Sequence, residues 1–394
     1  METARGGVTA GAEIATGTLA LRRLMLTDFR GYREASLNLD ARPLVLTGPN
    51  GAGKTNLLEA VSMLAPGRGL RRAKLSELAR NDGAGGWAVA ARIEGPHGSH
   101  EVGTGVTLDG GTERRVVRVD GRNAGGPAAF GDLLGIQWLT PQMDRLFIEA
   151  AASRRRFLDR LVFGIDPDHA RRVGAYERVM RSRNRLLKER TGDGSWMTAL
   201  EAQMAATAIA VAAARRDAVA WLSAALEKSV GPFPRARLAL EGELENGLDQ
   251  EPAVEVEQRF ADRLKANRSR DAAAGGAGAG PHRTDLLVWM AGHKDGAPEM
   301  PAAQCSTGEQ KALLIAIVLA NARLETARRG AAPVLLLDEV AAHLDPDRRA
   351  ALFGEILALN AQAWLTGTDR DWFDELRGRA AFVAVRDATV RLEE

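Results

Sequence analysis

The segment GPNGAGKTN, residues 48–56, combines closely spaced glycines with a lysine and a threonine, residue types that suit the binding of a phosphate chain. Its spacing matches the pattern G-x-x-x-x-G-K-[ST]. In such a loop backbone N–H groups wrap the phosphates, the lysine neutralises their oxygens, and the hydroxyl ligates Mg²⁺. We therefore expect ATP and Mg²⁺ as cofactors, held by Gly48, Asn50, Gly51, Ala52, Gly53, Lys54, Thr55 and Asn56.

Two adjacent carboxylates, Asp338 and Glu339, follow an apolar run at residues 334–337. A carboxylate at the end of a buried strand beside a phosphate loop is placed to hold Mg²⁺. Glu339 is placed to orient and deprotonate a water that attacks the γ-phosphate. A strand that merely ends in an acidic turn is the alternative, and the phosphate loop argues against it.

These side chains need elements that bring them together. Residues 43–48, PLVLTG, form a short apolar run that ends in glycine, as expected of a buried strand leading into a phosphate loop. Residues 56–67 have helical spacing and stop at a Pro-Gly pair. Further buried strands are predicted within residues 133–141, 332–339 and 361–367. This strand–loop–helix context disfavours a chance match of a glycine-rich turn.

The rest of the chain divides by pattern. Residues 87–122 alternate between apolar and polar types and contain Asp-Gly pairs, which predicts an antiparallel meander with a hairpin at Asp120-Gly121. After Pro141 the periodicity becomes helical. A helix from Ser195 to Ser229 would be about 50 Å long at 1.5 Å per residue, so we expect a projecting arm. Residues 270–280 are predicted to be a low-complexity loop or linker.

A polar cluster, Ser306 to Glu309, precedes the apolar run at residues 310–320. Serine or threonine followed by glutamate is typical of a helix cap. The free N–H groups and the dipole at a helix start also attract an anion, so the two roles are compatible. The cluster resembles the signature motif of ATP-binding-cassette (ABC) ATPases. The resemblance implies that Ser306, Thr307, Gly308 and Glu309 contact the γ-phosphate of an ATP held by a second subunit.

Other cassette elements follow in order. LTPQMD resembles the loop whose glutamine, Gln142, senses Mg²⁺ and the attacking water; Gln137 is the less favoured candidate. HLDP resembles the D-loop, which implies that Asp345 crosses the dimer. The segment WLTGTD lacks the histidine that often stands there, and Thr366 or Thr368 replaces it, so turnover is expected to be slow. The resemblance thus implies catalysis by Lys54, Gln142, Asp338 and Glu339, and Mg²⁺ ligation by Thr55, Gln142 and Asp338.

Several stretches, including LRRLMLTDFRGYREASLNLD, GPNGAGKTNLLEAV, GRGLRRAKLSEL and STGEQKALLIAIVLA, resemble the RecF family of bacterial replication and repair ATPases over residues 19–394. The resemblance implies an α/β fold, an ABC-type (SMC-like) ATPase head with an antiparallel β subdomain and an inserted helical arm. The expected division is a disordered leader (1–18), a first head lobe with the meander (19–148), the arm (149–280) and a second head lobe (281–394).

The same resemblance implies a function. ATP-driven homodimerisation would form a clamp on double- and single-stranded DNA at gaps and junctions. It would help RecO- and RecR-type partners to load recombinase and support the SOS response, and slow, weakly DNA-stimulated ATP hydrolysis would release it. The expected location is the cytoplasm, at the nucleoid. Arg30 either contacts the nucleotide or stabilises the edge of the core, and both interpretations stay open.

Overall charge makes no case for DNA, because the formal net charge is only +2. Local clusters do, since lysine and arginine neutralise phosphates without regard to sequence. We assign DNA binding to Arg68, Arg71, Arg72 and Lys74, with a solvated helix face or an internal ion pair as the alternative. Residues 154–156 and 181–190 are further basic clusters, for which a solvated helix face or an internal ion pair is the favoured alternative.

Other classes fit less well. An SMC-like chromosome-organising clamp without a repair role is the alternative, but it predicts long coiled coils or a hinge. A cassette-type nuclease needs acids in an additional catalytic domain, and a transporter ATPase needs a membrane partner. No window reaches about 18 uninterrupted apolar residues, so no transmembrane helix is predicted. The lone Cys305 excludes a disulfide framework and a cysteine-based zinc site.

Overall fold

The computed structural model describes residues 17–83, 85–109, 112–189, 194–229, 231–292 and 298–393. Most of the expected leader, residues 1–18, lies outside this set. At its end, the Gly17 backbone N–H donates to the Gly330 carbonyl.

A mostly parallel sheet forms the centre of the head, in the order β15-β14-β3-β13-β12-β8. Its parallel strands are β8 (Ile136–Leu139), β12 (Val334–Leu337), β13 (Ala363–Gly367), β3 (Leu44–Thr47) and β14 (Ala381–Arg386), and β15 (Thr389–Glu393) is antiparallel to β14. Because strands β3 and β12 are parallel within one sheet, the loop after β3 and the carboxylates after β12 leave the same edge. The strands expected around the phosphate loop are confirmed.

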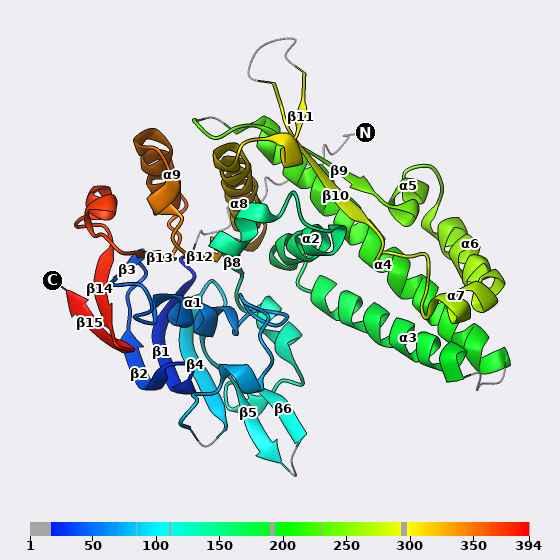
Figure 1. The fold of residues 1–394 in the computed structure, drawn as a ribbon, viewed down its shortest axis with the longest axis horizontal. Coiled ribbons are helices and arrows are strands. Elements are labelled where there is room, and N and C mark those ends of the chain that lie inside the picture. Colours follow the sequence, from blue (N-terminus) through cyan, green and yellow to red (C-terminus); the bar gives the residue numbers. More distant parts are fainter. Residues whose placement is uncertain are drawn as a thin grey trace, which may run out of the picture.

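An antiparallel sheet in the order β2-β1-β4-β5-β6-β7 packs over this centre (Figure 1). Its strands are β1 (Ala20–Phe29), β2 (Tyr32–Asn38), β4 (Trp87–Gly95), β5 (Gly98–Asp109), β6 (Thr112–Val119) and β7 (Arg122–Asn123). Asp120 and Gly121 both have positive φ, 49° and 77°, as a type I′ hairpin requires. The predicted meander and its hairpin are confirmed.

The central sheet is buried on both faces, and each face has its own core. On one face, Val334 and Leu336 pack with α1 (Lys54–Ser62) and the antiparallel sheet. On the other, Leu335 and Leu337 pack with helices α2 (Ala151–Ile165), α8 (Thr307–Arg329) and α9 (Pro346–Ala358). Alternate strand residues therefore serve opposite cores, which explains why these strands are apolar throughout.

A helical region extends from the head (Figure 1). The helical pattern after Pro141 is divided between α2 and α3 (His169–Glu189), and the predicted long helix is α4 (Gly194–Glu227). Helices α3, α4, α5 (Glu243–Leu248) and α6 (Ala253–Ala266) share a core. Helix α4 is long and apolar enough to cross a membrane by composition alone, but it contributes buried residues to this core and to that of α8, as a core helix does.

Strand β9 (Ala236–Glu241) pairs with β10 (Asp285–Met290), which pairs with the short β11 (Met300–Pro301). The expected linker at 270–280 is partly wrong. Its first half belongs to helix α7 (Arg268–Ala274), and Ala277 and Ala279 are buried in the arm core. Alanine favours a helix, and its small apolar side chain fits a tight interior. A segment rich in alanine and glycine can therefore be a packed helix or a linker, and composition alone does not distinguish the two. The division into lobes and arm remains a proposal.

Candidate functional site

The phosphate loop has a shape that only glycine permits at two positions. Gly48 has a φ of 148°, and a Cβ there would lie 2.1 Å from the Val385 carbonyl oxygen. Gly53 has a φ of 112°, and a Cβ would lie 2.7 Å from the Tyr32 hydroxyl. That hydroxyl donates to the Gly53 carbonyl at 3.2 Å. Strand β2 thus holds the loop from one side and β14 from the other.

Lys54 is buried at the start of α1, and its Nζ donates to the carbonyls of Gly48 and Pro49 at 2.5 and 2.9 Å. Burial lowers the pKa of this lysine, while the nearby Glu339 and Asp338 carboxylates oppose the shift. The ammonium group therefore lies inside the loop, where it donates to two loop carbonyls with two carboxylates nearby. This is the position from which a lysine neutralises phosphate oxygens.

Asp338 joins the phosphate loop to the neighbouring strand β13. Its Oδ1 accepts hydrogen bonds from the hydroxyls of Thr55, at 3.0 Å, and Thr366, at 2.9 Å. Burial raises the pKa of Asp338, and the two hydroxyl bonds oppose that rise. A hydroxyl and a carboxylate at this distance are suitable Mg²⁺ ligands, and Mg²⁺ completes its shell with waters and phosphate oxygens. Among the described residues no cluster of three or more His, Cys, Asp or Glu provides an all-protein metal site.

Glu339 follows in a left-handed backbone conformation, with a φ of 54°. Its backbone N–H donates to Thr366 Oγ1 at 2.8 Å, so one threonine hydroxyl fixes both acidic residues. Thr368, the other residue considered in place of a histidine, is exposed beyond the end of β13. A non-glycine residue held in this region is strained, a feature that concentrates at functional sites.

The two candidate glutamines lie in different settings. Gln137 is buried in β8, where its Nε2 donates to Glu325 Oε2 at 2.9 Å, an internal contact. Gln142 is exposed in the 3-10 helix Pro141–Arg145 that follows β8. The Asp338 backbone N–H donates to the Leu139 carbonyl of that strand, so Gln142 follows a strand end adjacent to Asp338. The sensing role of Gln142 stays a prediction.

Ser306 caps helix α8 in a reciprocal capping box with Glu309. The Ser306 side chain accepts from the Glu309 N–H at 3.3 Å, and the Ser306 N–H donates to Glu309 Oε2 at 2.8 Å. Asp345 caps α9 by accepting from the Arg348 N–H at 2.9 Å. Figure 1 shows α8 starting next to β11, away from α1. Contact of Ser306–Glu309 and Asp345 with a second subunit stays a prediction.

Sequence reasoning missed Glu59, a buried carboxylate in α1 that binds two arginines. Arg30 contacts it through two bonds of 2.8 Å, and Arg71 contacts it at 2.8 Å. Arg71 also donates to Asn56 Oδ1 at 2.9 Å. Arg30 thus has a structural partner at the core edge, and Arg71 is tied to the phosphate-loop helix. The available signal was an acid within an otherwise apolar helix face, LLEAV.

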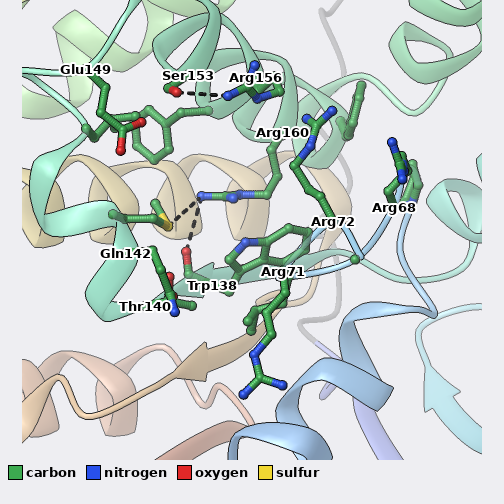
Figure 2. Close-up of a pocket in the computed structure, with 18 residues that line it drawn as sticks. Arg68, Arg71, Arg72, Trp138, Thr140, Gln142, Glu149, Ser153, Arg156 and Arg160 are labelled. Atoms are coloured by element: carbon green, nitrogen blue, oxygen red, sulfur yellow. Dashed lines mark hydrogen bonds between the residues drawn. The ribbon is translucent and has the colours of Figure 1, made fainter. Parts of the chain in front are cut away.

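Some of the basic residues line a cavity and others form internal ion pairs, and Arg71 does both. Arg68, Arg71 and Arg72 line an open cavity together with Arg156 and Arg160 (Figure 2). Lys74 is exposed on the same loop and does not line it. In the cluster at 154–156, Arg154 pairs with Asp285 at 2.6 Å, and in the cluster at 181–190 the buried Arg183 pairs with Glu201 and Asp271. For these two arginines the ion-pair alternative is confirmed.

Comparisons with known proteins agree with this geometry. A family model described as RecF/RecN/SMC N terminal domain matches residues 20–388. The DNA replication and repair protein RecF of Mesorhizobium japonicum is 50% identical over 372 residues, covering 94% of this chain and 97% of the relative.

Solved structures agree on the fold. The recombination mediator protein RecF-ATPrS in the RecFOR pathway matches with a TM-score of 0.81 at 20% identity, covering 97% of this chain and all of that one (100%). The Smc head domain from Pyrococcus furiosus matches with a TM-score of 0.53 at 16% identity, covering 95% and 96%. The fold is that of an ABC-type, SMC-like ATPase head.

Proposed function

Since this chain belongs to the RecF family, within the RecF/RecN/SMC group, we propose that it is an ATP-dependent DNA-binding protein of DNA replication and recombinational repair. The observation that carries the proposal is the cluster of Thr55, Asp338 and Thr366 at the edge of the sheet where the phosphate loop begins. The family is one of ATPases, and the residues present suit ATP with Mg²⁺.

The chain's own residues suggest how ATP is handled. When bound, Mg²⁺ would supply positive charge to the phosphates, held by Thr55 and Asp338 with Gln142 nearby. Lys54 neutralises phosphate oxygens from within the loop. Glu339 accepts a proton from the attacking water, and the N–H bond to Thr366 fixes its backbone for that task.

Dimerisation makes ATP a switch. In the proposed homodimer Ser306–Glu309 and Asp345 of one chain complete the ATP site of the other. The capping box already bonds the N–H groups of Ser306 and Glu309, so the helix dipole and the other first-turn N–H groups of α8 would attract the anion. Slow, weakly DNA-stimulated hydrolysis would then release the dimer from DNA.

The DNA substrate and the partners are proposed from the family. The clamp would hold double- and single-stranded DNA at gaps and junctions, and would act with RecO- and RecR-type proteins to load recombinase in the cytoplasm. The curated relative's name, DNA replication and repair protein RecF, supports this role over a purely chromosome-organising one. The exposed Arg68, Arg72 and Lys74 support the DNA contact.

The substitution Glu339→Gln tests this function. It keeps the side chain's size but removes the proposed base, so ATP should trap a dimer that stays on DNA. Size-exclusion chromatography with light scattering, with ATP and a gapped duplex, measures this. Lys54→Ala is the control and should stay monomeric, because it cannot hold ATP. A Glu339→Gln protein that remains monomeric and off DNA at saturating ATP would contradict the proposal.

A further inference from the structure

An open cavity of about 480 Å³ lies between the loop after α1 and the start of α2. Residues 66–72 form one wall, and β8 with the following turn and α2 form the others. Its volume falls in the range of about 300–1,000 Å³ that is usual for sites holding one small molecule. The phosphate-loop residues 48–56 do not line it, but Gln142, the proposed Mg²⁺-sensing residue, does, so the cavity adjoins the proposed ATP site.

The charges lining this cavity are unbalanced. It is lined by a single carboxylate, Glu149, and by five arginines, of which Arg71 also pairs with Glu59 at 2.8 Å outside the lining: Arg68, Arg71, Arg72, Arg156 and Arg160. Partial burial of the Arg72 guanidinium lowers its pKa, the neighbouring Arg156 and Arg68 lower it further, and Glu177 opposes the shift. A smaller adjoining cavity of about 210 Å³ shares Arg72 and Arg156. These cations repel one another unless an anion lies between them.

Arg160, at the floor of the cavity, is a buried cation with an incomplete set of hydrogen bonds. Its guanidinium carbon lies 4.3 Å from the centre of the Trp138 ring and 5.4 Å from that of Phe157. Burial lowers the pKa of Arg160 to about 9. Among the described residues its buried Nε has no hydrogen-bond partner, and Nη2 donates to the Trp138 carbonyl at 3.2 Å. Figure 2 shows this stacked pair at the centre of the lining residues.

The backbone at Arg72, in the wall of the cavity, is strained. Its φ is 57°, in the left-handed region that favours glycine. Such a conformation costs of order 1–3 kcal/mol and clusters at ligand sites. Among the described residues seven other non-glycine positions also have a positive φ, so the strain supports the proposal only together with the place of the Arg72 guanidinium in the cavity lining.

We propose that this cavity receives one unpaired nucleotide of a DNA strand, with its base against Arg160 and Trp138 and its phosphates at Arg68, Arg72 and Arg156. This inference rests on the function proposed above and adds a site that distinguishes a gap or junction from continuous duplex. Paired bases are stacked and cannot enter a cavity of this size, whereas an unpaired base enters at little cost. Arginine planes and aromatic rings are the usual platforms for such bases.

Arg71 connects this cavity to the ATP site. It lines the cavity and also donates to Glu59 and Asn56 of α1, the helix that begins at Lys54. A phosphate that draws Arg71 into the cavity weakens its hold on α1. The presence of an unpaired nucleotide is thereby communicated to the phosphate loop.

Two substitutions test the proposal by fluorescence anisotropy with ATP, on a gapped duplex and on a continuous duplex of equal length. Arg72→Gly removes the guanidinium while relieving the backbone strain, so the fold is kept, and Arg160→Leu keeps an apolar contact with Trp138. Arg160→Leu should weaken binding to gapped DNA by about tenfold and to continuous duplex by less than about twofold, and Arg72→Gly should weaken binding to gapped DNA more than binding to continuous duplex. Lys74→Ala, on the same loop but outside the cavity, should weaken both equally. Melting temperatures verify folding.

A second readout follows the base itself. The fluorescence of 2-aminopurine at the unpaired position beside the junction should fall on binding, because the base stacks, and Arg160→Leu should restore it. Equal loss of affinity for both DNAs, or no loss for either, would overturn the proposal. The proposal would also be overturned if free dAMP competed for the cavity as well as DNA does. The same holds if Arg160→Leu lost binding to an acidic aromatic peptide but kept its binding to DNA. If the wild type binds neither DNA, the proposed function fails as well.

Discussion

Thr366 is the residue on which the acidic pair depends. Its hydroxyl donates to Asp338 and accepts from the Glu339 N–H, so it sets the position of a proposed Mg²⁺ ligand and of the proposed base together. Sequence reasoning identified Thr366 and Thr368 equally, since only the absence of a histidine was visible. The structure separates them, because Thr366 is buried beside Asp338 and Thr368 is exposed.

Replacing this hydroxyl should slow ATP hydrolysis without weakening ATP binding. Thr366→Val keeps the volume but removes bonds to a carboxylate and to the Glu339 backbone. Hydrogen bonds to charged groups contribute about 1.5–3 kcal/mol, so kcat should fall about 10- to 100-fold, with the KM for ATP within about twofold. Steady-state ATPase assays measure both, and Thr368→Val should behave as wild type. An equal effect of the two substitutions would argue against the assignment.

At the scale of elements, the sequence pattern predicted the strands and turns that are determined by local signals. The apolar run of β3, the alternation of β4 to β6 and the Asp-Gly hairpin each contain their own evidence. Long-range partners were not visible. Strand β9 pairs with β10 across the intervening helices, and Glu59 finds Arg30 and Arg71 from separate segments. Such contacts depend on how elements pack, which no single segment encodes.

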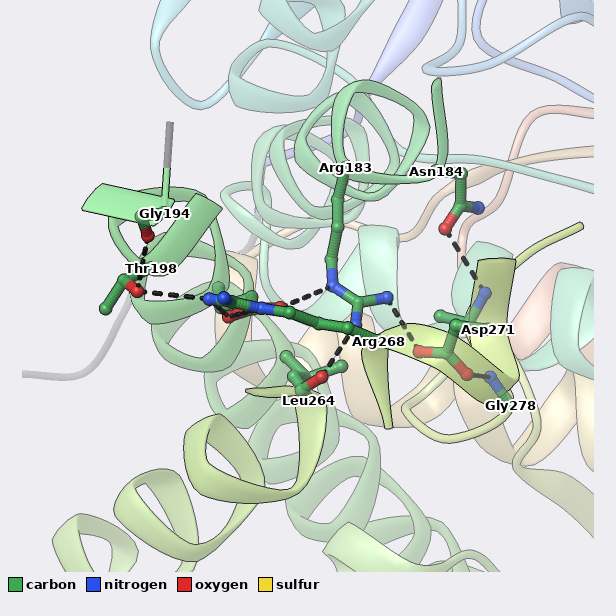
Figure 3. A network of polar contacts seen from close by, with 10 residues as sticks. Arg183, Asn184, Gly194, Thr198, Leu264, Arg268, Asp271 and Gly278 are labelled. Carbon is green, nitrogen blue, oxygen red and sulfur yellow. Dashed lines mark hydrogen bonds and ion pairs between the residues drawn. The ribbon is translucent and has the colours of Figure 1, made fainter. Parts of the chain in front are cut away.

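Helices α3, α4, α6 and α7 are held together by a buried ionic network (Figure 3). Arg183 in α3 is fully buried, with 0% of its side chain exposed. It donates to Glu201 of α4 at 3.1 Å, to Asp271 of α7 at 2.7 Å and to the Leu264 carbonyl of α6 at 2.7 Å. Arg268 also pairs with Glu201. If Arg183 is removed, Glu201 therefore keeps one arginine partner, whereas Asp271 loses its ion pair with Arg183.

Breaking this network should destabilise the arm more than its surface charge suggests. Arg183→Met fills the space but leaves the buried Asp271 carboxylate without its arginine partner, which costs about 3–5 kcal/mol of unfolding free energy. Urea unfolding followed by circular dichroism measures the loss. Arg181→Met is the matched control on the same helix, because its pair with Glu177 is exposed, and it should change stability by less than about 0.5 kcal/mol. Equal stability of the two variants would show that the network does not anchor the arm.

At the scale of the whole molecule, the candidate site has two halves, the phosphate loop with Asp338 and the start of α8. The first half is complete within one chain, and the second is proposed to act on another chain. The phosphate loop and the Asp338 strand meet within the fold, and sequence order with strand logic was enough to predict that meeting. The start of α8 has a complete capping box of its own. The proposed ligand of this helix start is the γ-phosphate of an ATP held by a second chain. A single chain therefore contains only one half of each composite ATP site.

Mixing two inactive variants tests that shared site. Lys54→Ala lacks its own phosphate-loop lysine, and Ser306→Arg blocks the anion site that it offers to its partner. Each alone should hydrolyse almost no ATP. In a mixed dimer, the Lys54 of the Ser306→Arg chain faces the intact Ser306 of the Lys54→Ala chain, so one of the two composite sites is whole. Because a dimer needs at least one whole site to form, only mixed dimers should assemble, and equal amounts should restore up to about half of the wild-type ATPase rate. An ATPase assay compares the mixture with each variant alone. In the control mixture Ser76→Arg replaces Ser306→Arg, because Ser76 lies on the exposed surface. The Ser76→Arg protein should be active without any partner. Hydrolysis by Ser306→Arg alone at the wild-type rate would show that each chain completes its own site.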